Sequence, residues 1–335
     1  MLVILTSLFT LSITELPALN VVSPVSDGPD LFSLAEENSN TCKSILSDYQ
    51  LAQLRAERAR IEARNPQGEL KAQESLINAR IEYMEQLEEF YLDVLESSFA
   101  VVITGLEEEV AELQLRIADE NLLQAKARFE SGKIPRLELA EAEVAKRRAE
   151  LELETSSWQR QDSMEDFVQT VEIEWSDKLL FGEPSVRSPS ENVKEWKKRD
   201  STIKRAELRL ERKQLEEEHL PTNAPEFNLQ LASAEVEQAQ SALERAEAAS
   251  ERLFEQLIRR IYLENETRQL HEEELHMHRE LLETAQRNHE QGLITTADLY
   301  QSRIQLVQAE IRAEQTRQNY LAATVKYTIG MEPGK

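Results

Sequence analysis

The two stretches that decide the fold are Ala127–Ala142, ARFESGKIPRLELAEA, and Ala285–Ser302, AQRNHEQGLITTADLYQS. The second stretch repeats the first at an offset of 160 residues, so that Gly132 falls on Gly292. Further matched positions are Leu122 and Leu282, Glu130 and Glu290, Ile134 and Ile294, and Leu139 and Leu299. Self-similarity at one long spacing indicates a duplicated unit. We therefore predict two copies of one helix–turn–helix hairpin, with each glycine in the left-handed conformation that ends a helix.

The segments around these turns predict six helices, bounded by Pro and Gly, which interrupt helical structure. They are expected over 34–64, 69–131, 135 to the 170s, about 190–219, 228–291 and 296–329. The breaks before the two longest helices are Asn65–Gly68 and Leu220–Pro225. We divide the chain into a signal-like segment and disordered arm (1–30), a first hairpin repeat (31–178), a linker (179–190) and a second hairpin repeat (191–335).

Composition favours long helices over a compact β or α/β domain. The 335 residues include only 8 Gly and 10 Pro, and 30% are charged. Tracts rich in Ala, Glu, Leu, Arg and Gln are typical of long helices and coiled coils. The net charge of −24 argues against DNA or RNA binding, which needs clustered Lys and Arg. Acidic walls would instead concentrate cations inside an enclosed lumen.

The sequence offers no constellation for catalysis, so we predict neither an enzyme nor a cofactor. It contains no nucleophile–base–acid set, Gly-rich phosphate loop or Cys/His cluster. Cys42 is the only cysteine and cannot form an internal disulfide. His271 has no second histidine four residues later, as a zinc-protease motif needs. His276 and His278 are two apart and point to different helix faces, so no metal site is predicted.

The first 30 residues differ from the rest of the chain. Leu2–Ile13 is an apolar run of signal-peptide length, followed by Pro17 and Ala18, although the first lysine is Lys43. We interpret it as an export signal, with an irregular N-terminal arm as the alternative. Residues 21–30 have the composition of a disordered segment. No stretch reaches the roughly 20 apolar residues of a membrane-spanning helix.

The last predicted helix carries two apolar rows. The first row is Leu299, Ser302, Leu306, Ala309, Ala313, Thr316, Tyr320 and Ala323. Its alternating steps of three and four are typical of a coiled-coil seam. A second row, Ile304, Val307 and Ile311, is offset from the first. Two seams on one helix predict two neighbouring helices, as a closed ring of helices requires.

Three tryptophans, Trp158, Trp175 and Trp196, flank the central linker. We expect them to pack the hairpin ends there. A belt of residues at a lipid surface is the alternative, since Trp is enriched at membrane interfaces.

The two glycine-centred stretches resemble the hairpin tips of TolC-type outer-membrane efflux proteins. In that family a helix end meets Gly, then an aliphatic residue, then a capped helix bearing an acid and a Leu. Residues 319–330 resemble the family's C-terminal helix. The resemblance covers about residues 34–332 and implies an all-α fold of duplicated long helical hairpins that form an α-helical barrel or coiled-coil tunnel. Each of three protomers would supply four helical strands, two continuous and two made of shorter helices stacked end to end.

The chain departs from this family at the transmembrane strands. Family members carry two strands per half, between the short and the long helices, and one membrane strand needs about 9–11 residues. The corresponding slots hold only Asn65–Gly68 and Leu220–Phe227. We therefore expect the β-barrel to be absent or vestigial, and the resemblance does not extend to autonomous insertion into the outer membrane.

The resemblance places two sets of residues at functional positions. The adaptor-docking tips are Gly132, Ile134, Pro135, Gly292, Leu293 and Ile294. The tunnel aperture is Asp298, Gln301, Glu138 and Glu141. The alternative for the tips is that they only shape a turn. Asp298 lies three residues after Thr295, so it is either a helix-capping residue or part of a carboxylate ring that selects cations.

By resemblance, the chain is a periplasmic tunnel component of a tripartite efflux or type I secretion system. It would act as a passive conduit, a homotrimer that works with a periplasmic adaptor and an inner-membrane pump. The location implied is the periplasm or outer membrane of a Gram-negative-type bacterium. The alternative is a structural coiled-coil or scaffold protein derived from the same family, with no conduit.

Overall fold

The computed structural model describes residues 31–176, 193–221 and 223–331, and within them every regular element is an α-helix. The helices are α1 (Leu31–Asn38), α2 (Asn40–Glu62), α3 (Pro66–Glu130), α4 (Arg136–Val171), α5 (Val193–Arg199), α6 (Ser201–Glu218), α7 (Glu226–Glu290) and α8 (Thr296–Met331). The predicted all-α fold of long helical hairpins is confirmed. The expected signal-like segment (1–30) and the linker (179–190) lie outside the described residues.

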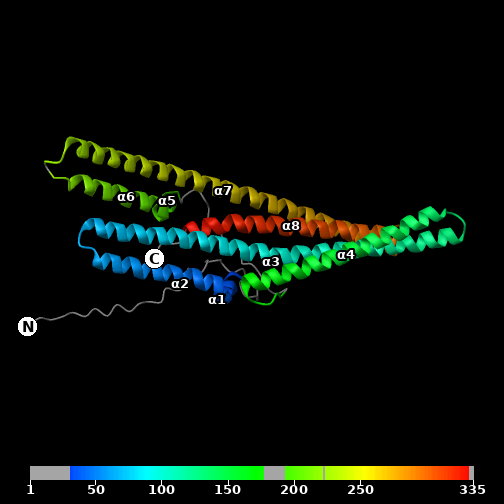
Figure 1. Ribbon diagram of the computed structural model, residues 1–335. Coiled ribbons are helices and arrows are strands. Elements are labelled where there is room, and N and C mark those ends of the chain that lie inside the picture. The colour runs from blue at the N-terminus through cyan, green and yellow to red at the C-terminus, as the bar shows by residue number, and fades with distance from the viewer. Residues whose placement is uncertain (1–30, 177–192, 222, 332–335) are drawn as a thin grey trace, which may run out of the picture.

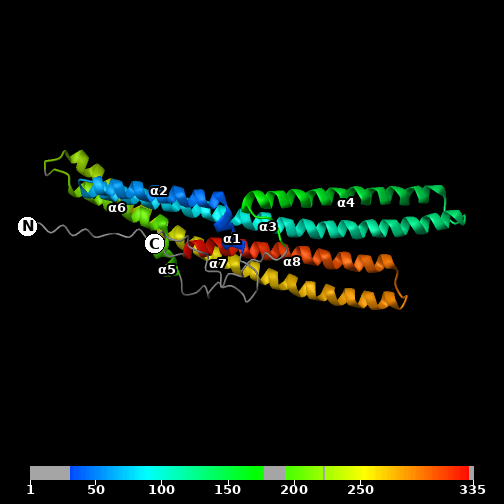
Figure 2. The ribbon, with the colours of Figure 1, turned by 90° about the horizontal axis from the view of Figure 1, so that it is seen from below.

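The molecule is an elongated bundle whose length is set by α3 and α7 (Figure 1). Each of these helices has 65 residues, which corresponds to a length of about 100 Å. Both turns that follow them, α3–α4 and α7–α8, lie at one end, which we term the tip end (Figure 2). The α2–α3 and α6–α7 links lie at the other, the connection end. The two long helices start 160 positions apart, at Pro66 and Glu226.

Four helical strands lie side by side, and their order follows from which helices pack together. α2 and α4 lie along successive parts of α3, while α6 and α8 lie along successive parts of α7. α3 also packs against α6 and α8. The order across the protomer is therefore α2 and α4, then α3, then α5, α6 and α8, then α7. The predicted pair of neighbours for the last helix is confirmed, because α8 packs against both α3 and α7.

The first pair of short helices meets end to end at a buried junction. The sequence predicted one helix from 34 to 64, but the structure breaks it at Ser39, between α1 and α2. Glu172, in the left-handed conformation at φ 60°, ends α4. Its carboxylate accepts hydrogen bonds from the backbone N and Nδ2 of Asn40, at 2.7 and 2.5 Å. A carboxylate at a helix N-terminus stabilises it, so Glu172 caps α2 from another helix.

The second junction is built around Trp196 of α5. Its indole is buried near Phe254 and Tyr327, and its Nε1 donates to Ser250 Oγ at 3.1 Å. The sequence predicted one helix up to 219, but Asp200 separates α5 from α6 and caps α6 by accepting from the backbone N of Thr202 at 2.7 Å.

The other two tryptophans have different outcomes. Trp175 packs edge-on against Phe167, with ring centroids 5.1 Å apart, as the packing prediction required. Trp158 does not pack a hairpin end, because its side chain lies on α4 and is 60% exposed. The prediction is wrong for this residue, and its exposure needs another explanation.

Candidate functional site: the hairpin tips and the helical edges

The two tips adopt the same backbone conformation. Gly132 and Gly292 both have φ of 70°, which confirms the predicted left-handed glycines. At the first tip, Gly132 N donates to Phe129 O and Lys133 N donates to Arg128 O, both at 2.8 Å. The corresponding two hydrogen bonds at Gly292 and Leu293 are both 2.9 Å. This pattern is a Schellman motif, which satisfies the last carbonyls of the long helices.

The side chains predicted for adaptor docking lie on the surface of these turns. Leu293 is 68% exposed, whereas Ile134 and Ile294 are half-buried. Pro135 is the residue before α4 and makes no side-chain capping hydrogen bond. His289 Nδ1 lies 3.3 Å from Ile294 O, across the second turn. The tips therefore present rigid, partly apolar turns, and their docking role stays a prediction.

Asp298 forms a complete capping box at the start of α8. Its Oδ2 accepts from the backbone N and the hydroxyl of Thr295, at 2.9 and 2.7 Å, and its own N donates back to Thr295 Oγ1 at 3.2 Å. These hydrogen bonds hold the pKa of Asp298 below its usual value. The capping interpretation has direct geometric support, while the aperture role of Asp298, Gln301, Glu138 and Glu141 stays a prediction. All four are exposed.

The two tips are not level along the bundle. Arg303 of α8 pairs with Glu109 of α3 at 2.7 Å, which sets these two residues at one height. Glu109 lies 23 residues before Gly132, whereas Arg303 lies 11 residues after Gly292, a difference of 12. Lys326 and Glu88, paired at 3.1 Å, lie 34 and 44 residues from the same glycines, a difference of 10. The first tip therefore projects about 15–18 Å beyond the second, as Figure 2 shows.

Exposed large apolar side chains gather on the two edges of the protomer. Among the described residues, 17 of the 20 such side chains belong to α2, α4 and α7, and none belongs to α5, α6 or α8. On α4 they form a row at strict seven-residue steps: Leu137, Val144, Leu151 and Trp158. On α7 a second row is Leu263, Leu270 and Met277. We term these the α4 row and the α7 row. Sequence reasoning missed both, although their heptad spacing was visible.

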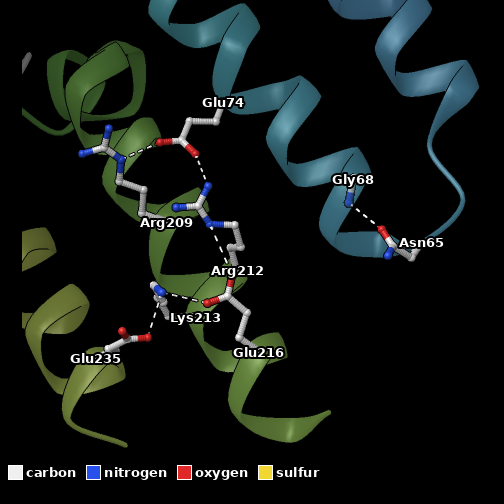
Figure 3. A network of polar contacts seen from close by, with 8 residues as sticks. All are labelled: Asn65, Gly68, Glu74, Arg209, Arg212, Lys213, Glu216 and Glu235. Atoms are coloured by element: carbon white, nitrogen blue, oxygen red, sulfur yellow. Dashed lines mark hydrogen bonds and ion pairs between the residues drawn. The ribbon is translucent and has the colours of Figure 1, made fainter. Parts of the chain in front are cut away.

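At the connection end, ion pairs connect α6 to both long helices (Figure 3). α6 buries only Ile203 among its hydrophobic residues. Glu74 of α3 accepts from Arg209 at 2.6 Å and from Arg212 at 2.7 Å. Lys213 donates to Glu216 of its own helix and bridges to α7 by donating to Glu235, both at 2.8 Å. The two contacts of Lys213 raise its pKa, and the ion pairs of Glu74 tie the second hairpin repeat to the first.

Two kinds of site are not found in the described ranges. No helix there combines the length and the apolar character needed to cross a membrane. No group of three or more His, Cys, Asp or Glu side chains there is arranged to hold a metal ion.

Comparison with known proteins gives a fold and no close relative. No protein-family model and no curated protein matches the sequence. Among solved structures, the outer-membrane channel OprN superposes with a TM-score of 0.58 at 11% identity, over 90% of this chain and 89% of that one. The Campylobacter jejuni CmeC outer membrane channel gives 0.56 at 10% identity, over 90% and 84%. The outer membrane protein VceC from Vibrio cholerae gives 0.55 at 12% identity, over 90% and 96%.

The chain therefore has the fold of these outer-membrane channels, over nearly the whole length of each. The resemblance predicted from the two glycine-centred tips is confirmed at the level of the fold. The proteins compared are named as channels and membrane proteins rather than enzymes.

Proposed function

We propose that this protein is the tunnel-forming component of an envelope efflux or type I secretion system, a passive conduit made of three copies. The observation that supports it most is the location of the exposed apolar side chains on α2, α4 and α7. The middle helical strands have a neighbour on both sides, whereas the edge strands have one. Apolar rows left open at both edges are what a protomer shows when its neighbours are further copies of itself.

The two edges differ, so copies would associate through unlike surfaces. One edge consists of α2 and α4, and the other consists of α7. Such a heterologous contact generates a closed ring if the rotation between copies closes. Four helical strands per protomer give twelve in a ring of three, the number that the family resemblance implies.

The remaining parts of the proposal concern partners and place. The tips would dock a periplasmic adaptor, which connects the conduit to an inner-membrane pump, within a Gram-negative-type cell envelope. Rigid turns support such a role, because they present the exposed Leu293 and the half-buried Ile134 and Ile294 in a fixed geometry. The excess of carboxylates would favour passage of cations or neutral solutes over anions.

The ring is tested by the mass of the purified protein in solution, measured by light scattering coupled to size exclusion. We expect a trimer for the wild type and a monomer for Leu151→Glu, because a charge replaces a member of the α4 row. Leu123→Glu is the matched control, since Leu123 is 65% exposed and Leu151 is 58% exposed, but Leu123 lies on α3, away from the edges. A monomeric wild type, or one that forms an antiparallel dimer, would contradict the ring.

The docking role is tested separately by export. Gly292→Val forces a β-branched residue into a left-handed backbone and is expected to abolish export while the trimer persists. Unchanged export from a cell whose conduit carries Gly292→Val would reject docking at the second tip.

A further inference from the structure

We propose that Trp158 anchors one copy to the next by packing against Met277 of that copy's α7. This inference rests on the proposed ring and specifies its register. In this register the two tips of every copy stay at different heights, with the α3–α4 tips projecting beyond the α7–α8 tips.

The two rows share the seven-residue repeat of coiled-coil seams. Leu137, Val144, Leu151 and Trp158 are 51–69% exposed, and each step between them is seven residues. Leu263, Leu270 and Met277 are 50–63% exposed at the same step. Seven-residue repeats of apolar side chains are the pattern by which helices pack as coiled coils. Within the protomer α4 packs mainly on α3, and α7 packs on α5, α6 and α8, so neither row has a partner in the described chain.

The register follows from closure of the ring. Within one copy the second tip falls 10–12 residues short of the first, as the Arg303–Glu109 and Lys326–Glu88 pairs show. Copies related by a closed rotation stand at one height. At the contact between copies, the second tip of one copy must therefore also fall 10–12 residues short of the first tip of its neighbour. Trp158 lies 26 residues after Gly132, so it stands level with residues 14–16 before Gly292 of the next copy, which are 276–278.

Two further side chains of α4 come near exposed leucines of α7 in this register, whereas Leu137 and Val144 stand at or beyond the second tip of the next copy. Leu151 comes level with residues 283–285, beside the exposed Leu281. Val168 comes level with 266–268, between Leu263 and Leu270.

In the alternative register, the α3–α4 tip of one copy is level with the α7–α8 tip of the next. The α4 row would then face carboxylates. Val144, Leu151 and Trp158 would then stand at the heights of Glu280, Glu273 and Glu266. All three glutamates are exposed. Apolar side chains buried against carboxylates are unfavourable, because the charge loses its hydration. The offset register instead places an indole against a thioether, a contact that sulfur and aromatic rings favour. Trp is also among the residues most often found at the energetic centre of interfaces.

A second copy is the occupant that the chain itself supplies. The α7 row lies on the opposite edge of the same protein with the matching repeat, and its Met277 end comes level with the Trp158 end of the α4 row. An unrelated helical protein would have to reproduce both features. It is therefore left as an outcome of the test.

Cysteine cross-linking tests the register directly. Cys42 is the only native cysteine and is buried, so it does not compete with introduced thiols. The full-length trimer carrying Trp158→Cys and Met277→Cys is treated with a short bismaleimide and run on a denaturing gel. We expect covalent dimers and trimers. The matched level-tip pair, Trp158→Cys with Glu266→Cys, should give none, because residues 266 and 277 are about 16 Å apart along the helix.

A second pair keeps the anchor intact, in case its loss disperses the ring. Leu151→Cys with Thr284→Cys should cross-link, whereas Leu151→Cys with Glu273→Cys should not. Cross-linking only in the level-tip pairs, or in no pair although light scattering gives a trimer, overturns the register. The register is also overturned if the protein is a monomer and a different protein covers Trp158. Cross-linking in the offset pairs without any export would uphold the register and reject the conduit, so the two failures are distinguishable.

Discussion

The surroundings of two helical glycines predict that Gly330→Ala destabilises the protein and that Gly105→Ala stabilises it. A Cβ at Gly330 would lie 2.3 Å from Cζ3 and 2.4 Å from Cη2 of Trp196. The indole cannot yield easily, because it is 5% exposed and hydrogen-bonded to Ser250. At Gly105, in α3, the nearest atoms are Nε and Cζ of Arg160, at 3.6 and 3.8 Å, which are ordinary contacts. Of these two glycines, only Gly330 therefore has no room for a methyl group.

The magnitudes follow from two opposing terms. Alanine is favoured over glycine inside a helix by about 1 kcal/mol. Overpacking of a buried site costs about 1–3 kcal/mol, and loss of the Trp196–Ser250 hydrogen bond costs about 1 kcal/mol more. Gly330→Ala should then destabilise the protein by about 1–3 kcal/mol, whereas Gly105→Ala should stabilise it by up to about 1 kcal/mol.

Urea unfolding followed by far-UV circular dichroism measures both variants at one protein concentration. The decisive control is Gly330→Ala in a Trp196→Leu background, where the clash is gone and alanine should become neutral or stabilising. A double-mutant cycle isolates this coupling. The reasoning is refuted if Gly330→Ala stabilises the protein as much as Gly105→Ala, or if its cost is unchanged without the indole.

Three further predictions concern charged or titratable groups. Burial and the nearby Glu36 raise the pKa of Cys42 to about 11, so its contribution to stability is complete below the ordinary thiol pKa and is lost as pH rises toward 11. Urea midpoints between pH 8 and 11 should therefore fall more steeply for the wild type than for Cys42→Ala. The pKa of Asp298 is lowered by Thr295, so its contribution is present above the ordinary carboxyl pKa and is lost as pH falls through the lowered value. Amide exchange in the first turn of α8 should then be faster in Asp298→Asn at neutral pH, and the two proteins should converge in acid. Glu74→Gln should speed amide exchange in α6, which Arg209 and Arg212 attach to α3, whereas Glu82→Gln, at an exposed acid of the same helix, should not.

The sequence was sufficient for the elements that local rules define. Pro66, Gly132 and Gly292 mark real helix ends, because these residues act through their own backbone, whereas Gly68 lies in the first turn of α3. The capping box of Thr295 and Asp298 was also visible, since its two partners are three residues apart. At such places the interacting residues lie within one turn of the chain, so the sequence pattern alone predicts the interaction.

Long-range partners explain what the sequence did not show. Helix α2 begins at Asn40 because a carboxylate from residue 172 caps it, 132 positions away. Asp200 ends α5 in a stretch whose composition reads as continuous helix. The offset between the tips depends on which cation of α8 meets which acid of α3, and periodicity alone cannot decide that. The exposed rows on α4 and α7 were missed for another reason, since a heptad row reads as a core seam until a structure shows that nothing covers it.

The offset between the tips also separates the conduit from the scaffold. Each copy lowers its second tip by 10–12 residues relative to its first, or about 15–18 Å. If the next copy joined with its tips level, every added copy would be displaced by that amount along the axis. Unlike surfaces that do not close build open helical filaments, and such a filament would be a structural scaffold with no lumen. If the Trp158–Met277 contact compensates for this offset, all copies stand at one height, and the ring closes and encloses a channel. Register at this one contact therefore decides between the two functions, and a sedimentation profile of discrete trimers rather than a concentration-dependent series of longer assemblies is what the conduit requires.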